Sequence, residues 1–134
     1  MYLVDTNVWL ERFLEHERAE EVRDFLNQTP SDQLCLTDFA LHSIGIVLSR
    51  LSKREAFVRF VRDAFIDGAV ALVRLDPEDM DTLVQIMERY NLDFDDAYQC
   101  RAAEKYRLVI VSFDDDFDRT ALGRKTPAQV LQET

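Results

Sequence analysis

The sequence predicts an α/β fold built around a mostly parallel β-sheet. Short apolar segments of strand length alternate with amphipathic helical segments along the chain, which is the pattern of parallel-sheet proteins. The segment 107–112, RLVIVS, is almost entirely β-branched or apolar, as expected for a strand that is buried on both faces. With 134 residues, 47% of them hydrophobic, and no repeat or linker, the chain is expected to form one domain over residues 1–134.

The first half of the chain alternates two predicted strands with three predicted helices. Apolar residues at three- and four-residue spacing identify the helices. The helix over 38–51 is apolar on most of its circumference, which predicts burial against the sheet and against a further surface, with a second subunit as one candidate. The expected elements are a strand over Tyr2–Val4, a short helix that carries Trp9, Leu10, Phe13 and Leu14, a helix over 17–28, a strand over 34–36 and the helix over 38–51.

The second half repeats this alternation. Its first helix, over 54–67, carries a Phe-rich apolar face, and Gly68 precedes the next strand. Pro77 stands where the start of a helix tolerates proline. The expected elements are the helix over 54–67, a strand over 69–75, a helix after Pro77, a helix over 93–106 and the strand over 107–112.

The composition narrows the range of functions. A formal net charge of −10 and a pI of about 4.6 exclude a general nucleic-acid coat protein, because such proteins neutralise phosphate with basic residues. An acidic excess remains compatible with a polyanionic substrate if the acids hold a cation, and it favours a basic protein partner. Cys35 and Cys100 fit neither a zinc pattern nor a disulfide framework. Together with the lack of a signal sequence or a membrane-length apolar run, they predict a cytoplasmic protein.

Three groups of acidic residues fall at the ends of predicted elements. Asp5 follows the first strand, a second group opens the late helix, and a third follows the last strand; the latter two groups are Asp93, Asp95 and Asp96, and Asp114, Asp115 and Asp116. Carboxyl ends of parallel strands and the N-termini of the following helices share one edge of a sheet, so these groups are expected to converge. Clustered carboxylates repel one another unless a cation neutralises them, and such oxygen ligands suit Mg²⁺ or Mn²⁺.

Each acidic group also has a simpler interpretation. Asp5, Thr6 or Asn7 can cap the helix that follows, since these residue types are common at helix N-termini. Asp93 and Asp96 can be a helix cap and its first-turn neighbour, which the helix dipole favours. The convergence of three groups on one edge favours the metal site over three separate caps.

These acids stand in motifs that resemble the PIN domain family. The motifs are Asp-Thr-Asn at the end of the first strand, Asp96-Ala97 opening a late helix, and S-F-D-D-D-F from Ser112 to Phe117. The resemblance extends in order from Asp5 to Phe117, and the best-populated branch of this family is the toxin ribonucleases (VapC-like) of toxin–antitoxin pairs. It implies a three-layer α/β/α sandwich, metal-dependent cleavage of RNA, a homodimer, and inhibition by a small antitoxin protein.

The resemblance also implies roles for individual residues. The catalytic, metal-binding acids are Asp5, Asp96 and Asp114, with Asp116 as an auxiliary metal ligand. Thr6, Asn7 and Ser112 complete the motifs around these acids. Asp95 is the alternative to Asp96, which we prefer because Gln99, Cys100 and Ala103 lie on its helical face.

One position departs from the family pattern. The family's second acid is normally a Glu about five residues beyond a Ser or Thr, on the helix that follows the second strand. Counted from Thr37, this position is His42, and Asp38 lies four residues earlier on the same helical face. Either His42 is a metal ligand, which would favour Mn²⁺, or Asp38 replaces the acid, or His42 is a packed core residue beside a weakened site.

The basic residues are concentrated in one region. Arg50, Lys53 and Arg54, with Arg59 and Arg62, are candidates for binding RNA phosphates, but a solvated helix face explains these residues more simply. We therefore expect a divalent-metal-dependent endoribonuclease, with two alternatives left open. One is a PIN-like binding or regulatory module with weakened catalysis, and the other is a different metal-dependent phosphate-processing domain.

Overall fold

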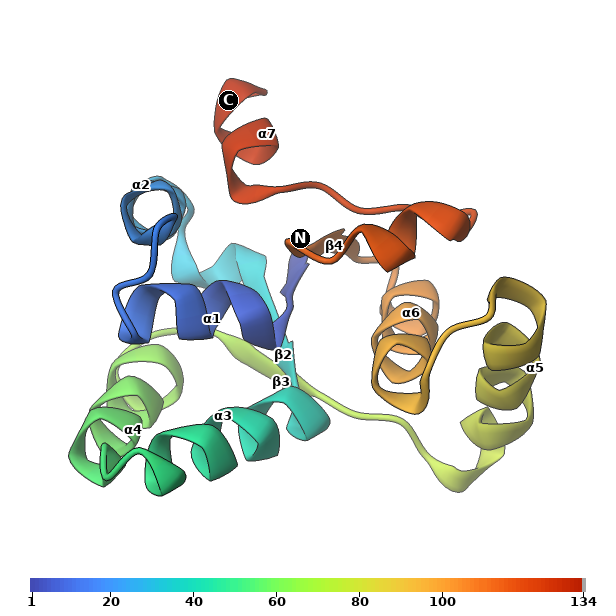
Figure 1. Ribbon diagram of the computed structural model, residues 1–134, viewed down its shortest axis with the longest axis horizontal. Helices are drawn as coiled ribbons and strands as arrows, with labels where there is room; N and C mark the ends of the chain where they lie inside the picture. The colour runs from blue at the N-terminus through green and yellow to red at the C-terminus, as the bar shows by residue number, and fades with distance from the viewer. Residues whose placement is uncertain (134) are drawn as a thin grey trace.

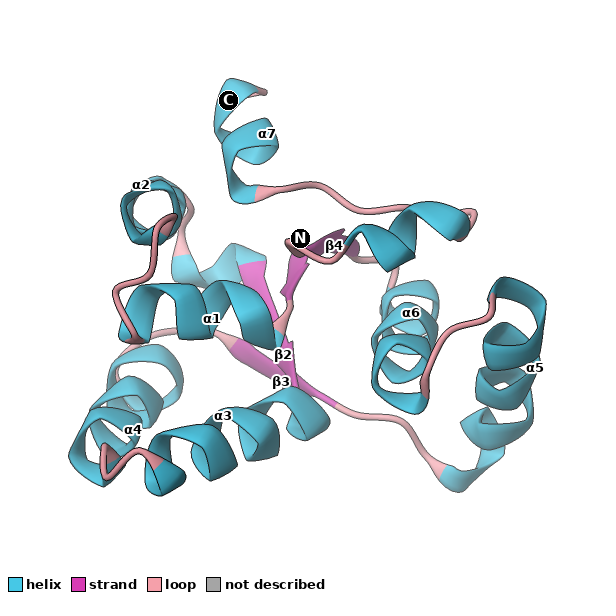
Figure 2. Cartoon of the chain, in the orientation of Figure 1, coloured by secondary structure: helices cyan, strands magenta, loops and turns pink. Residues whose placement is uncertain are grey.

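A four-stranded sheet forms the centre of the computed structural model, which describes residues 1–133. All strand pairs are parallel and the strand order is β3-β2-β1-β4. Figure 2 shows the short strands between the helical layers. The strands are β1 (Tyr2–Val4), β2 (Leu34–Thr37), β3 (Ala71–Val73) and β4 (Val109–Val111). The predicted parallel α/β architecture is confirmed.

The strand order places the end of β1 beside the end of β4. Leu3 on β1 lies opposite Cys35 of β2 on one side and Ile110 of β4 on the other. The chain builds outward from β1 through β2 to β3 and then returns to pair β4 with the free side of β1. Open parallel sheets bind ligands outside the carboxyl ends of their strands where the order reverses in this way. Here that position lies between β1 and β4.

Helices cover both faces of the sheet and complete the sandwich (Figure 1). One layer contains α5 and α6, and the other contains α1 to α4 with α7 at its edge. The helices are α1 (Thr6–Phe13), α2 (Ala19–Gln28), α3 (Asp38–Arg50), α4 (Arg54–Val61), α5 (Met80–Tyr90), α6 (Phe94–Tyr106) and α7 (Pro127–Gln132).

Alternating side chains of the strands feed two separate cores. Leu3 and Ile110 pack with α5 and α6, whereas Val4 and Val111 pack with the helices of the other layer. All four side chains are almost fully buried. Because successive residues of a strand point to opposite faces, β1, β2 and β4 each contribute to both cores. The edge strand β3 contributes Ala71 and Val73 to the core on α5 and α6, and its Leu72 is exposed. Strands of three or four residues are therefore enough to join the two layers.

Two elements differ from the sequence-based expectation. The helix expected over 54–67 ends at Val61 and continues as a π-helical turn, Arg62–Ile66. The chain then returns closely past this turn at Gly68, where a Cβ atom would lie 2.5 Å from the Asp63 carbonyl oxygen. The second difference is α7, which has no counterpart in the elements expected from the sequence.

A buried ion-pair network fixes α6 against the segment that enters α5. Asp79 is almost fully buried and accepts hydrogen bonds from Lys105 Nζ at 2.7 Å and from Arg101 Nη2 at 3.1 Å, both on α6. The hydrogen bond from Lys105 is the main reason why the pKa of Asp79 falls to about 2. The stabilisation from this lowered pKa is present at neutral pH and is lost as the pH falls from about 4 towards 2. The network holds α6 in the orientation that presents its N-terminus to the edge of the sheet.

Among the described residues, no helix is both long enough and apolar enough to cross a membrane.

Candidate metal centre

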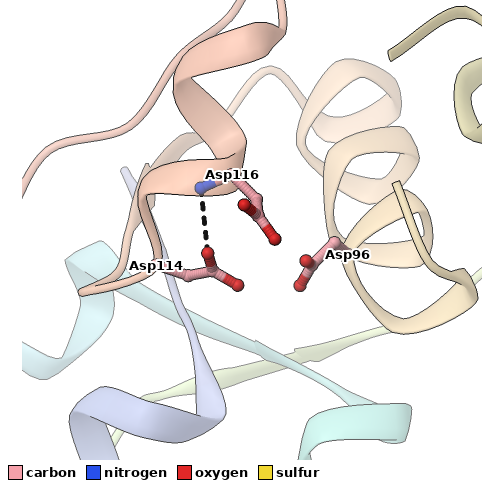
Figure 3. Close-up of side chains that lie close together, drawn as sticks. All are labelled: Asp96, Asp114 and Asp116. Atoms are coloured by element: carbon pink, nitrogen blue, oxygen red, sulfur yellow. Dashed lines mark hydrogen bonds between the residues drawn. The ribbon is translucent and has the colours of Figure 1, made fainter. Parts of the chain in front are cut away.

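Three aspartates converge at the edge of the sheet where β1 and β4 end. Asp96 lies in the first turn of α6, and Asp114 and Asp116 lie in the segment that follows β4. One carboxylate oxygen from each lies within 4.8 Å of the other two, and Figure 3 shows the three side chains directed towards a common space. The convergence expected from the sequence is therefore present for these three residues.

The same edge carries a cavity of about 310 Å³ that several neighbouring side chains line. Asp5, Asp96 and Asp114 line it together with Asp93 and the exposed Asp95. All three acidic groups of the sequence thus contribute to one cavity. Its other lining residues are Thr6, Asn7, Leu10, Phe39, Ser43 and Gln99.

Capping hydrogen bonds at the starts of helices fix the positions of these acids. Asp5 precedes α1 in an extended conformation, and its Oδ1 accepts a hydrogen bond from Thr6 N at 2.7 Å. Asp93 caps α6 by accepting from Asp96 N at 2.9 Å, and Asp114 accepts from Asp116 N at the same distance (Figure 3). The capping interpretation and the site interpretation are therefore compatible, because the caps direct the carboxylates of Asp96 and Asp116 towards one another.

Asp5 is the most heavily hydrogen-bonded acid of the site. Besides Thr6 N, its Oδ1 accepts from Gln99 Nε2 at 2.8 Å, and its Oδ2 accepts from Ser112 Oγ at 2.7 Å. Ser112 Oγ in turn accepts from Asn7 Nδ2 at 3.3 Å and from Asp114 N at 2.9 Å. The Asp-Thr-Asn motif and Ser112 thus tie β1 to the segment after β4. Asp5 is outside the group of three close oxygens and fixes the frame that holds them.

Burial and mutual repulsion strongly perturb the acids. Burial, followed by repulsion from Asp114, Asp93 and Asp5, raises the pKa of Asp96 from 3.8 to about 8. Burial also raises the pKa of Asp5, against the opposing hydrogen bond from Ser112. Within residues 1–133, the only ion pair of the three clustered aspartates joins Asp116 to the half-exposed Arg119 at 2.7 Å. The cluster therefore carries negative charge that the protein itself neutralises only in part.

The ligand set fits a hard divalent cation. The three close carboxylate oxygens belong to Asp96, Asp114 and Asp116, and no His or Cys joins this group in the described part of the chain. The buried Gln99 lines the same cavity, and its Oε1 has no hydrogen-bond partner. Oxygen-only sites of this kind suit Mg²⁺ and Mn²⁺ rather than softer transition metals.

The residues of α3 that face the acidic cavity differ from those expected from the sequence. The side chain of His42 is exposed and does not line the acidic cavity, so His42 is neither at the site nor a packed core residue. Asp38 Oδ1 accepts hydrogen bonds from Phe39 N and from Tyr98 OH, each at 2.8 Å, and Asp38 is also absent from the cavity lining. The residues that α3 presents to the cavity are Phe39 and Ser43. Counting from Thr37 therefore missed the facing position by one residue.

The basic residues lie away from the acids. Arg50 ends α3, and Lys53 and Arg54 begin the exposed start of α4, where they line a different cavity with Arg59. Arg50 is seven residues beyond Ser43, about 10 Å along the helix axis at 1.5 Å per residue. A further cavity, of about 620 Å³ between α1, α2 and α4, likewise contains none of the clustered acids. The structure therefore does not bring the proposed phosphate-binding residues to the acidic cavity.

Comparison with known proteins agrees with this architecture. The sequence profile of the PIN domain matches residues 2–122, whereas no curated protein matches the sequence significantly. A toxin–antitoxin complex from Klebsiella pneumoniae contains a similar chain, with 18% identity, a TM-score of 0.75, and coverage of 95% of this chain and 98% of that chain.

Two further solved structures show the same fold. VapC20 from Mycobacterium tuberculosis, described as a toxin that cleaves the sarcin–ricin loop, gives a TM-score of 0.77 at 16% identity over 91% of this chain and 96% of that one. FitAcB from Neisseria gonorrhoeae gives 0.75 at 17% identity over 95% and 98% of the two chains. At these identities the structural likeness establishes the fold.

The raised pKa of Asp96 predicts an inverse dependence of metal-free stability on pH. Between its ordinary value of 3.8 and about 8, folded Asp96 holds a proton that the unfolded chain releases, so this group lowers the free energy of unfolding as the pH rises. Asp96→Asn keeps the shape and needs no proton. In EDTA we expect this variant to melt above wild type at about pH 8, with the difference shrinking towards about pH 5. Melting curves followed by circular dichroism measure this.

The matched control is Asp24→Asn, which changes an exposed aspartate of α2. Its melting temperature should follow wild type at every pH. An Asp96→Asn variant that melts below wild type at about pH 8 would contradict the raised pKa of Asp96.

Proposed function

The chain belongs to the PIN domain family, and we propose that it is a divalent-metal-dependent endoribonuclease, the toxin of a toxin–antitoxin pair. The observation that carries this proposal is the convergence of Asp96, Asp114 and Asp116 within 4.8 Å at the edge where β1 and β4 end. The similar fold of the Klebsiella toxin–antitoxin complex and of VapC20 supports it. The buried free thiols of Cys35 and Cys100 favour action in the cytoplasm.

The proposed reaction is the hydrolysis of a phosphodiester bond in RNA. Asp96, Asp114 and Asp116 would hold Mg²⁺ or Mn²⁺. When bound, the cation supplies an activated water as nucleophile and offsets charge on the phosphate and the leaving oxygen. Asp5 and Ser112 keep the segment after β4 in place through their 2.7 Å hydrogen bond. The protein needs the cation to accept a polyanion here, because its own charge at this edge is negative.

The alternative of a binding module with weakened catalysis has one specific observation in its favour. The α3 residues that face the cavity are Phe39 and Ser43, so this helix contributes no carboxylate to the cavity lining. A site with fewer anionic ligands is expected to bind the cation less tightly. The two functions differ in whether the purified protein turns over RNA, which a cleavage assay decides.

Two protein partners belong to the proposal. We infer a small antitoxin that presents an Arg or Lys to the acidic cavity, which the net charge of −10 favours. A neighbouring gene for a small protein, and loss of inhibition when its basic residue is changed, would test this. We still predict that Arg50, Lys53 and Arg54 bind RNA phosphates. Because these residues lie away from the acidic cavity, only a longer RNA strand could reach both places.

We also infer a homodimer formed through the layer of α3 and α4. Both helices lie side by side in Figure 1 and carry large apolar side chains that are about half exposed, among them Ile46 at 51% and Val58 at 54%. Leu51, between the two helices, is 49% exposed. Exposed apolar side chains on two packed helices favour a protein–protein interface.

RNA cleavage is the direct test of the proposed activity. We expect the purified protein to cleave single-stranded RNA in Mg²⁺ or Mn²⁺ and to stop in EDTA. Asp114→Asn removes a ligand charge without changing shape, and we expect it to lower the rate by at least about a hundredfold, since residues that only orient ligands already cost about 10- to 100-fold. Asp115→Asn, an exposed change in the same segment, is the control and should cleave normally. Undiminished cleavage by Asp114→Asn would contradict the proposed role of the clustered aspartates in catalysis.

A carboxylate added at Ser43 tests which position of α3 faces the site. Ser43→Glu places an acid on the cavity-lining face, and we expect it to lower the Mg²⁺ concentration needed for half-maximal cleavage. His42→Glu is the matched control, because His42 is exposed and outside the cavity lining. Rates over a Mg²⁺ titration give the answer. A gain for His42→Glu with none for Ser43→Glu would restore the position counted from the sequence.

Light scattering tests the dimer. At micromolar concentration we expect wild type to have twice the chain mass of 15.7 kDa, and the double variant Ile46→Glu, Val58→Glu to have the chain mass, because each new charge would be buried in the interface. Val84→Glu, on exposed α5 of the opposite layer, is the control and should remain dimeric. A monomeric wild type would refute the dimer without affecting the proposed activity.

A further inference from the structure

The side chain of Gln99 has one satisfied end and one unsatisfied end. Gln99 lies on α6, three residues after Asp96, and is only 6% exposed. Its Nε2 donates a hydrogen bond to Asp5 Oδ1 at 2.8 Å. Its Oε1 is buried and has no hydrogen-bond partner. A buried amide oxygen without a partner is costly, so its retention calls for an explanation.

The neighbouring hydrogen bonds determine the orientation of this amide. Ser112 Oγ accepts from Asn7 Nδ2 and from Asp114 N, so its single proton is directed to Asp5 Oδ2. Oδ1 of Asp5 already accepts from Thr6 N. Both Asp5 oxygens therefore act as acceptors, and only the NH₂ end of Gln99 can face them. A reversed amide would place two acceptor oxygens against each other.

The side chain that carries the unpaired oxygen belongs to the lining of the acidic cavity. Gln99 lines the same cavity as Asp5, Asp96 and Asp114. Ser43, on α3, is a second neutral residue of that lining with an oxygen in its side chain. An amide oxygen is a hard donor like a carboxylate oxygen, but it adds no negative charge to the cluster. Such an oxygen suits a cavity in which burial and repulsion already oppose ionisation of the acids.

We propose that Gln99 is a positioning residue of the metal centre, whose Nε2 fixes Asp5 and whose Oε1 is a neutral oxygen partner of the hydrated divalent cation. This inference rests on the proposed metal-dependent function. It assigns to α6 the contribution that α3 does not make through a carboxylate. The unsatisfied oxygen gains its partner when the cation binds, so the metal should bind more tightly with Gln99 than without it.

Calorimetric titration with MnCl₂ and MgCl₂ measures this contribution separately from RNA cleavage. Gln99→Met keeps the length of the side chain and removes both ends of the amide, and we expect Mn²⁺ affinity to fall by about 10- to 100-fold. Gln99→Glu removes the NH₂ donor but keeps an oxygen at the Oε1 position, and we expect affinity equal to or above that of wild type. Circular dichroism establishes that both variants are folded. Gln85→Met, an exposed change on α5, is the control and should bind as wild type.

The outcomes separate the inference from the function on which it rests. Wild-type affinity in Gln99→Met would overturn the role of Gln99. Equal losses in Gln99→Met and Gln99→Glu would overturn the role of Oε1, because the hydrogen bond to Asp5 alone would then explain the effect. No binding of Mn²⁺ by wild type would refute the metal centre itself, and with it this inference.

Discussion

The carboxylate of Asp5 accepts hydrogen bonds from three parts of the chain that are far apart in the sequence. The donors Thr6 N, Gln99 Nε2 and Ser112 Oγ belong to α1, to α6 and to the segment after β4 respectively. Burial raises the pKa of Asp5, and the hydrogen bonds from these donors act in the opposite direction. Without this carboxylate, the donors would be buried near acids that repel one another. The positions of Asp96 and Asp114 relative to each other therefore depend on Asp5, even though Asp5 is not among the three closest oxygens.

A cluster of acids can persist in a folded protein only if other interactions offset its repulsion. Part of this repulsion is offset by hydrogen bonds from backbone N–H groups at the starts of helices. The carboxylates of Asp5, Asp93 and Asp114 accept these hydrogen bonds. The positive end of the α6 dipole acts in the same direction on Asp96. These contributions are incomplete, since the pKa of Asp96 remains raised to about 8. The remaining imbalance is what a divalent cation would remove.

The sheet and the position of the acids could be predicted from the sequence, because they depend on the order of strands and helices along the chain. The alternation of strands and helices predicted the parallel sheet. The acids that follow strands were then expected at one edge of the sheet, because parallel strands all end at the same edge. The face that α3 presents depends instead on how the helix packs on its neighbours, which spacing from Thr37 does not determine. Rotation by one residue, about 100°, separates the exposed His42 from Ser43 in the cavity lining. The short helix α7 was missed although Thr126 and Gln129 form a capping box at its start.

The same reasoning explains why neutral residues complete the cavity. A further carboxylate on α3 would add repulsion to a cluster in which Asp96 already resists ionisation, and the metal-free fold would bear that cost. The amide of Gln99 and the hydroxyl of Ser43 offer oxygen without charge at the same cavity. The ion pair between Asp79 and Lys105 contributes stability at a position that is separate from the clustered acids and does not depend on the cation. Neutral oxygens therefore spare the metal-free fold further repulsion, while a site with fewer anionic ligands binds the cation less tightly. The geometry of the remaining oxygens, which the hydrogen bonds around Asp5 hold in place, then matters more for binding.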